Sequence, residues 1–155
     1  MRKKIAVDIF SGAGGLSIGA EMAGVKTILA VEYDKHAADS FKKNHREATV
    51  LNQDIRTVNP LEHTAKFPFI LMGGPPCQGY SRMGKSDKDD PRRSLLGHFF
   101  RTVNIIRPKF FIMENVEGLM DERNRYELEN AIQVLDKHYV VLEPMIVDAS
   151  LYGVP

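Results

Sequence analysis

The chain has 155 residues, of which 43% are hydrophobic and 26% are charged, a composition typical of one globular domain. Its apolar runs fall far short of the roughly 20 residues that cross a bilayer and no apolar leader opens it, so we expect a cytoplasmic protein without a membrane partner. One cysteine excludes an intrachain disulfide, and because Cys and His are not spaced as in a zinc site, we expect no metal. The formal net charge of +1 does not by itself indicate a nucleic-acid surface.

The first half of the chain alternates apolar runs with amphipathic stretches, which predicts strand and helix units in a parallel sheet. We expect strands at 4–9, 27–32 and 49–51, helices at 15–23 and 35–44, and a short helix at 60–64. A fourth strand at 69–72 leads into residues 73–94, whose glycines, prolines and mixed charges predict a long loop.

The second half continues this alternation without a linker or a repeat, so residues 1–155 are expected to form a single domain. A helix at 95–106, stopped by Pro108, is followed by a fifth strand at 110–114 and a helix at 125–138. A sixth strand is expected at 139–147, where Pro144 implies a bulge or an edge position.

A glycine-rich turn, Phe10-Ser11-Gly12-Ala13-Gly14-Gly15, lies between the first strand and the first helix. Glycines there let the backbone turn tightly and bring bare amides close to a ligand. A dinucleotide-binding motif would have a further glycine at position 17, but Ser17 stands there, which disfavours a nicotinamide-dependent oxidoreductase. Glu32, at the end of the second strand, can accept hydrogen bonds from both ribose hydroxyls of an adenosine. The alternative is an ordinary turn beside a solvated carboxylate.

Three more side chains follow strand ends on this side of the sheet. Tyr33 is placed to stack on an adenine or to cover the sheet edge. Asp54 is placed to accept a hydrogen bond from the adenine amino group while Ile55 packs on its face. The alternative for this pair is a surface aspartate next to a core isoleucine.

Cys77 follows two prolines at the carboxyl end of the fourth strand, where open parallel sheets bind ligands, so we interpret it as a reagent. The prolines donate no hydrogen bond, which leaves the Pro75 carbonyl free to accept one from an exocyclic amine. Glu114, at the end of the fifth strand, should face the same crevice. A thiolate can add to C6 of a pyrimidine when a carboxylic acid binds N3, and C5 then becomes a nucleophile for a sulfonium methyl group. The alternative for Glu114 is a capping or ion-paired carboxylate.

These segments together resemble the DNA (cytosine-5) methyltransferase family. Residues 8–15 are similar to its first motif, 73–81 (Gly-Gly-Pro-Pro-Cys-Gln-Gly-Tyr-Ser) to its fourth, and 113–116 (Met-Glu-Asn-Val) to its sixth. Residues 90–95 match the stretch that ends the family's long loop. Order and spacing agree over nearly the whole chain.

The resemblance implies an α/β fold of the Rossmann-like class I S-adenosylmethionine-dependent methyltransferases, with a mostly parallel sheet that stops before the seventh strand. It also implies S-adenosylmethionine as cofactor, S-adenosylhomocysteine as product, and a setting in restriction and modification. The cofactor-binding residues that it implies are Phe10, Ser11, Gly12, Ala13, Gly14, Gly15, Glu32, Tyr33, Asp54, Ile55 and Leu95.

By the same resemblance, Cys77 adds to C6 of the target cytosine, and Glu114 holds N3 and the amino group together with the Pro75 carbonyl. Pro76 belongs to the same base pocket, while Ser81 and Asn115 either brace the loop or touch the base. The partner is duplex DNA with a flipped cytosine, since a stacked base hides C6. Four cations of the loop at 78–94 either meet phosphates or are solvated beside its acids: Arg82, Lys85, Arg92 and Arg93.

Family members continue after a run such as 152–155 with a basic segment, a seventh strand and a target-recognition region. The seventh strand lies between the fifth and sixth, so we expect a vacant slot there and a need for a second chain or C-terminal segment. Two rivals remain open: a related branch that methylates cytosine in transfer RNA, and a non-catalytic module that retains the fold and binds S-adenosylmethionine.

Overall fold

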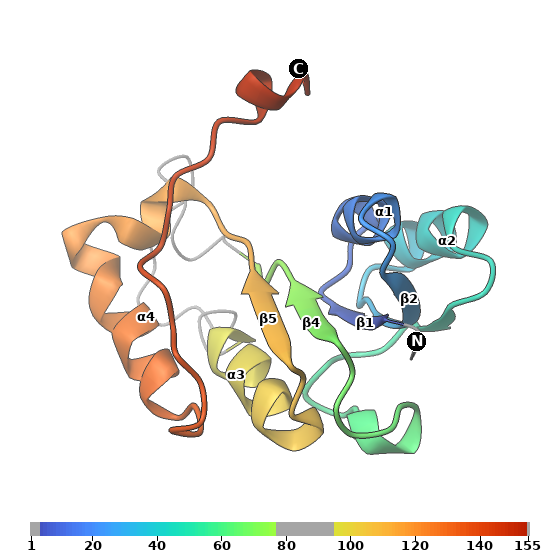
Figure 1. Cartoon of the computed structure of the whole chain (residues 1–155), viewed down its shortest axis with the longest axis horizontal. Coiled ribbons are helices and arrows are strands. Elements are labelled where there is room, and N and C mark those ends of the chain that lie inside the picture. Colours follow the sequence, from blue (N-terminus) through green and yellow to red (C-terminus); the bar gives the residue numbers. More distant parts are fainter. Residues whose placement is uncertain (1–3, 77–94, 155) are drawn as a thin grey trace.

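The computed structural model describes residues 4–76 and 95–154 and contains one sheet of five strands (Figure 1). Its order is β3-β2-β1-β4-β5, and every neighbouring pair is parallel. The strands are β1 (Ile5–Ile9), β2 (Lys26–Val31), β3 (Thr49–Leu51), β4 (Ile70–Gly73) and β5 (Phe110–Met113). The expected α/β fold with a parallel sheet is confirmed, with the first five strands within a residue or so of their predicted positions.

In the part of the chain that the structure describes, four α-helices connect or flank these strands: α1 (Gly15–Met22), α2 (Lys35–Asn44), α3 (Leu95–Ile106) and α4 (Glu122–Gln133). The same residues include three short 3-10 helices, which are η1 (Pro60–Glu62), η3 (Glu117–Met120) and η4 (Ala149–Tyr152). None of the helices in the described part of the chain is long and apolar enough to cross a membrane.

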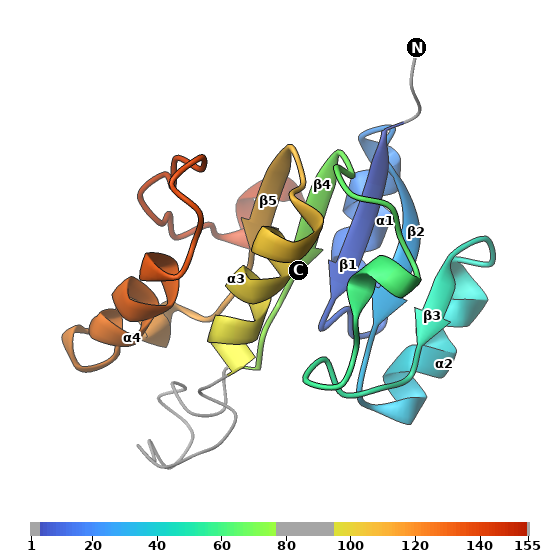
Figure 2. The same ribbon diagram turned by 90° about the horizontal axis from the view of Figure 1, so that it is seen from below.

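The core has two layers because successive side chains of a strand point to opposite faces of the sheet. Val7 and Ile9 of β1 face α3, whose Phe99, Phe100 and Val103 are all buried. Ala6 of β1 and Met72 of β4 belong to a smaller cluster on the opposite face, against α1. The helices α1 and α3 therefore lie on opposite faces of the sheet (Figure 2).

The chain changes direction across the sheet at β1. From β1 it runs outward through β2 to β3, and then returns to the other side of β1 to form β4 and β5. In open parallel sheets a crevice opens at such a switch point, beyond the carboxyl ends of the strands. Strands β1 and β4 are especially close there, since a Cβ added to Gly73 would lie 2.2 Å from the carbonyl oxygen of Ile9.

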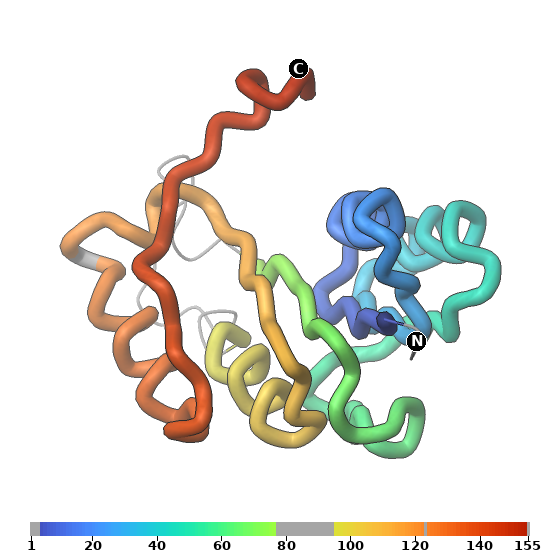
Figure 3. Tube along the Cα trace, in the orientation of Figure 1, coloured from blue at the N-terminus to red at the C-terminus, as the bar shows by residue number. Residues whose placement is uncertain are grey.

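The prediction of a sixth strand at 139–147 is wrong: residues 139–148 form no strand or helix. The segment runs between β5 and α4 and then away from the body of the molecule (Figure 3). Its side chains are largely exposed, with Leu142 at 81% and Met145 at 82%. It makes no ladder because a groove separates it from β5, and because Pro144 has no backbone N–H to donate.

The predicted helix at 125–138 is also displaced, since α4 begins and ends earlier than expected. The side chain of Asn104 on α3 explains why α4 ends early. Its side-chain amide donates to the carbonyl oxygen of Val134 at 2.7 Å and accepts from the backbone N–H of Asp136 at 2.9 Å. These two bonds hold the chain in a turn where the helix would otherwise have continued.

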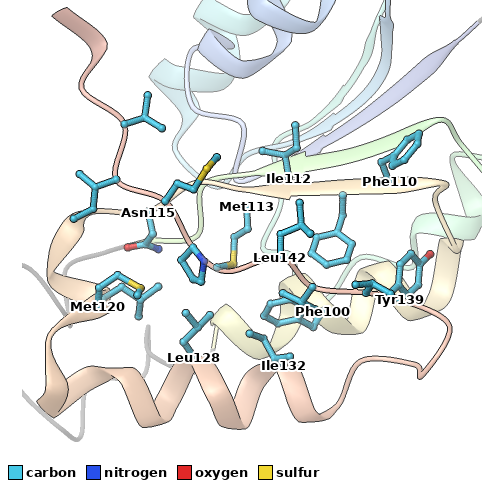
Figure 4. A pocket seen from close by; sticks show the side chains of 18 of the residues that line it. Phe100, Phe110, Ile112, Met113, Asn115, Met120, Leu128, Ile132, Tyr139 and Leu142 are labelled. Atoms are coloured by element: carbon cyan, nitrogen blue, oxygen red, sulfur yellow. The ribbon is translucent and has the colours of Figure 1, made fainter. Parts of the chain in front are cut away.

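The groove between β5 and residues 139–148 has a volume of about 960 Å³ (Figure 4). Its walls are mostly apolar, and they include Phe110, Ile112, Met113, Leu128, Ile132 and Leu142. Within the described residues β5 pairs with β4 alone, so its other edge faces the groove. The groove lies beside the fifth strand, on the side where the sequence analysis expected a vacant slot.

Substituting Gly73 tests the close approach of β1 and β4. We expect Gly73→Ala to lower the free energy of unfolding by about 2 to 3 kcal/mol, because the methyl group would overlap the Ile9 carbonyl and force the strands apart. Gly97→Ala in α3 is the matched control, since a Cβ there meets open space and helix propensity favours alanine by up to ~1 kcal/mol. Urea unfolding followed by circular dichroism measures both; equal stabilities would contradict the argument.

Candidate cofactor and active site

The side chains singled out in the sequence gather at the carboxyl edge of the sheet, because all five strands run in the same direction. Strand β1 is followed by Phe10 to Gly15, β2 by Glu32 and Tyr33, and β3 by Asp54 and Ile55. Strand β4 is followed by Pro75 and Pro76, and β5 by Glu114 and Asn115. Leu95 is the first residue of α3. Cys77 and Ser81, with the rest of residues 77–94, lie outside the described residues.

The glycine turn leaves β1 through three residues with positive φ: Phe10 at 56°, Gly12 at 55° and Gly14 at 101°. The backbone N–H of Ser11 donates to the carbonyl of Val31 at 3.2 Å, which ties the turn to β2. Gly14 is the N-cap of α1. The amides of the turn therefore lie at the positive end of a helix dipole, which favours an anionic or electron-rich ligand.

Glu32 is hydrogen-bonded to the turn. Its Oε2 accepts from the backbone N–H of Gly12 at 2.8 Å, and its Oε1 accepts from the N–H of Asp34 at 2.7 Å. The amide of Asn52 donates to the carbonyls of Glu32 and Tyr33, at 3.0 and 2.8 Å, and so fixes the backbone that carries both side chains. A carboxylate held in this way keeps free lone pairs for hydroxyl groups of a ligand.

Arg56 is a neighbour of the predicted adenine edge that the sequence reasoning did not single out. Its guanidinium binds the Asp54 carboxylate through Nε at 3.0 Å and through Nη2, and these hydrogen bonds hold the pKa of Asp54 below its usual value. Ile55 is only 4% exposed and packs in the main core, while the ring of Tyr33 is 77% exposed at the sheet edge.

Glu114 lies against the segment that precedes Cys77. Its backbone N–H donates to the carbonyl of Gly73 at 3.0 Å, and its Oε2 is 3.0 Å from the place that a Cβ on Gly74 would occupy. The side-chain amide of Asn115 donates to the Pro75 carbonyl at 3.0 Å. One lone pair of that carbonyl is therefore used within the chain and the other is left for a ligand.

A buried polar network beneath the turn was also not predicted from the sequence. Asp8 of β1 is fully buried, and its Oδ2 accepts a hydrogen bond of 2.6 Å from the Ser17 hydroxyl. Thr27 of β2 in turn donates to Ser17 at 3.0 Å. Burial raises the pKa of Asp8 from 3.8 to about 6, although the hydrogen bond from Ser17 lowers it. Ser17, noticed in the sequence only as a missing glycine, links the first helix to two strands.

The chain has a parallel sheet with a glycine turn after its first strand, and a carboxylate at the end of its second strand is bound to that turn. This arrangement is typical of α/β proteins that bind nucleotides or related ligands at the carboxyl edge of the sheet. The family model for C-5 cytosine-specific DNA methylases matches residues 5–155. The chain belongs to this family.

Several relatives support this assignment. The chain is 39% identical to the type II methyltransferase M.DdeI of Desulfomicrobium norvegicum, over 96% of this chain and 37% of that protein. It is 40% identical to M.HindV of Haemophilus influenzae, over 96% of this chain and 48% of that protein. The chain thus spans less than half the length of these relatives.

Solved structures agree on the fold. A DNA modification methyltransferase encoded within an Escherichia coli prophage matches with a TM-score of 0.83 at 35% identity, over 96% of this chain and 42% of that one. DNMT2 of Spodoptera frugiperda matches with a TM-score of 0.61 at 23% identity, over 83% of this chain and 40% of that one. The expected Rossmann-like methyltransferase fold is confirmed.

The raised pKa of Asp8 predicts a pH dependence of stability. The folded chain holds this proton more tightly than the unfolded chain, so the contribution of Asp8 to stability is complete below about pH 4 and is lost as the pH rises through 6. We expect the difference in free energy of unfolding between the wild type and Asp8→Asn to fall by roughly 2 kcal/mol from pH 4 to pH 7. Denaturant titrations at several pH values measure it. A difference that stays constant with pH would contradict the buried, protonated carboxyl.

Proposed function

We propose that this chain is the cofactor-binding and catalytic part of a DNA (cytosine-5) methyltransferase of a restriction-modification system. It transfers a methyl group from S-adenosylmethionine to C5 of cytosine through a covalent bond between Cys77 and C6. The observation that carries the proposal is the contact of Glu114 with Gly74, because it puts a carboxyl group beside the segment that ends in the sole cysteine.

The turn and its neighbours fit S-adenosylmethionine. The buried Ser11 hydroxyl finds no hydrogen-bond partner within the described structure, and the turn presents backbone amides at the start of α1. Glu32 would hold the ribose hydroxyls, and Asp54 the adenine amino group. Phe10, Tyr33, Ile55 and Leu95 would enclose the adenine, while Ser11, Gly12, Ala13, Gly14 and Gly15 would line the rest of the molecule. When bound, the cofactor supplies an electrophilic methyl group.

The residues of this chain prepare the base to accept that methyl group. Cys77 adds as a thiolate to C6 of cytosine, and the negative charge that develops on the ring is neutralised at N3 by Glu114 acting as an acid. The Pro75 carbonyl accepts a hydrogen bond from the exocyclic amine, and Asn115 holds that carbonyl in place. C5 would then take the methyl group, with S-adenosylhomocysteine as the leaving group. Transfer of the C5 proton to water, return of the N3 proton to Glu114 and expulsion of the Cys77 thiolate would restore the aromatic ring.

The substrate is duplex DNA with the target cytosine flipped out of the stack, because neither face of C6 is open to a thiol inside a helix. Pro76, just before the loop at 78–94, and Ser81 within it would belong to the pocket of the flipped base. Arg82, Lys85, Arg92 and Arg93 would meet phosphates there.

The groove beside β5 would bind a complement, by which we mean a second chain or a C-terminal segment. This complement would add a strand to the sheet and supply target recognition. The half-exposed Phe110 and Ile112 on β5 and the exposed Leu142 across the groove give it apolar walls. An unpaired strand edge bordered by such walls favours the addition of a strand.

Removing the Glu32 carboxylate tests the cofactor role. We expect Glu32→Ala to weaken binding of S-adenosylhomocysteine by about 30-fold, which corresponds to the loss of hydrogen bonds to a charged acceptor worth roughly 2 kcal/mol. Isothermal titration calorimetry of the 155-residue chain measures it. Glu129→Ala on α4 is the control, since this exposed carboxylate pairs only with Arg125 among the contacts described and should leave the affinity unchanged. Equal affinity in both variants would count against an adenosine site.

Trapping on DNA tests the chemistry. With the complement present, a duplex carrying 5-fluorocytosine should become covalently attached to the wild type and not to Cys77→Ser, because fluorine at C5 blocks the release of the enzyme. Glu114→Gln should slow methylation about 100-fold or more through loss of the acid. Glu62→Gln, the same change on the exposed helix η1, should have no effect.

Three outcomes would contradict parts of the proposal. Attachment to transfer RNA in preference to duplex DNA would assign the chain to RNA methylation. Failure of the complemented chain to attach to either substrate would leave a module that only binds the cofactor. Full methylation by the 155-residue chain alone would contradict the need for a complement.

A further inference from the structure

His45, the residue that follows α2, lies buried between α1 and the glycine turn. Its side chain is 1% exposed, and its Nδ1 is 2.9 Å from Oε1 of Glu21 on α1. The ring also packs on Phe41 of α2, with ring centroids 4.4 Å apart. Because a carboxylate only accepts hydrogen bonds, Nδ1 carries the proton, and in the neutral ring Nε2 is then an acceptor. No partner of Nε2 is found within the described structure.

The imidazole ring is pressed against Gly14. A Cβ added to Gly14 would lie 2.5 Å from Nε2 and 2.8 Å from Cδ2 of His45, so the ring occupies the space directly beside the glycine. Gly14 also has a φ of 101°, a backbone conformation that residues other than glycine rarely adopt. Both the histidine ring and the backbone conformation therefore disfavour a side chain at position 14.

A turn with glycines at positions 12, 14 and 15 has much conformational freedom to lose and gains little order from its own side chains. Its order must come from contacts outside the turn. The Glu32 carboxylate holds the Gly12 amide on one side, and the His45 ring fills the space behind Gly14. Ordering the turn in advance reduces the entropy that a ligand must remove on binding.

We propose that His45 is a positioning residue for the cofactor: it acts through Gly14 to hold the amides of the turn in their binding geometry, and it is itself held by Glu21. The proposal rests on the proposed function of the turn, but it assigns a role to residues outside the predicted cofactor contacts. His45 does not touch the cofactor in this scheme, so its effect is exerted on the order of the turn.

The test compares three variants of the 155-residue chain in two measurements: the affinity for S-adenosylhomocysteine, and amide hydrogen exchange of residues 10–16 in the cofactor-free protein. His45→Ala removes the ring, and we expect about 10-fold weaker binding and about 10-fold faster exchange. His45→Phe restores a ring of similar size without the bond to Glu21, and both values should return to within about 3-fold of the wild type.

Val103→Ala is the control for stability alone, since Val103 is buried in α3 on the opposite face of the sheet. It should destabilise the chain without changing either measurement at the turn. Wild-type exchange at residues 10–16 in His45→Ala, or equal acceleration in Val103→Ala, would overturn the proposal. If the wild type did not bind S-adenosylhomocysteine, the proposed function would fail, while the exchange data would still decide whether His45 orders the turn.

Discussion

The structure depends above all on the parallel pairing of β1 with β2 on one side and β4 on the other. The register sets Val31 opposite Ile9, Ile9 opposite Gly73, and Gly73 opposite Met113. The residues that follow this row are therefore neighbours at one edge of the sheet: Glu32, Phe10, Gly74 and Glu114. The glycine turn, the Glu32 carboxylate, Gly74 and Glu114 therefore all follow one row of paired residues.

Three carboxyl groups on or just after β1, β2 and β3 have different surroundings. Asp8 lies below the turn without solvent, and burial raises its pKa to about 6. Glu32 accepts two backbone N–H groups, and Asp54 pairs with the guanidinium of Arg56. Of these three groups, Glu32 and Asp54 lie where a ligand can reach them, whereas Asp8 holds α1 to the sheet through Ser17.

The local rules of strand and helix formation were sufficient to predict five strands, three of the four α-helices and the edge where the site lies. They worked because apolar periodicity and glycine turns are local signals. The segment at 139–147 has the composition of a strand, but a strand also needs a neighbour to pair with, and a groove separates this segment from β5. Composition does not show whether such a neighbour lies within hydrogen-bonding distance.

The parts of the site that the sequence did not reveal depend on contacts between distant residues. Arg56 appears in the sequence as one more charged residue, and His45 as one more histidine after a helix. Their partners become visible only when β3 brings Asp54 to the edge and α2 brings His45 against Gly14. Side-chain roles of this kind are set by the packing of elements and have no periodic signature.

The groove beside β5 has a further consequence for the chain as a molecule in a crowded cell. Its border exposes Val140, Leu142, Met145 and Ile146 next to an open strand edge, a surface that also suits a second copy of the same chain or any unfolded peptide. Apolar side chains gathered beside a strand edge favour self-association. We therefore expect the concentration of the chain to set the balance between dispersed and aggregated molecules.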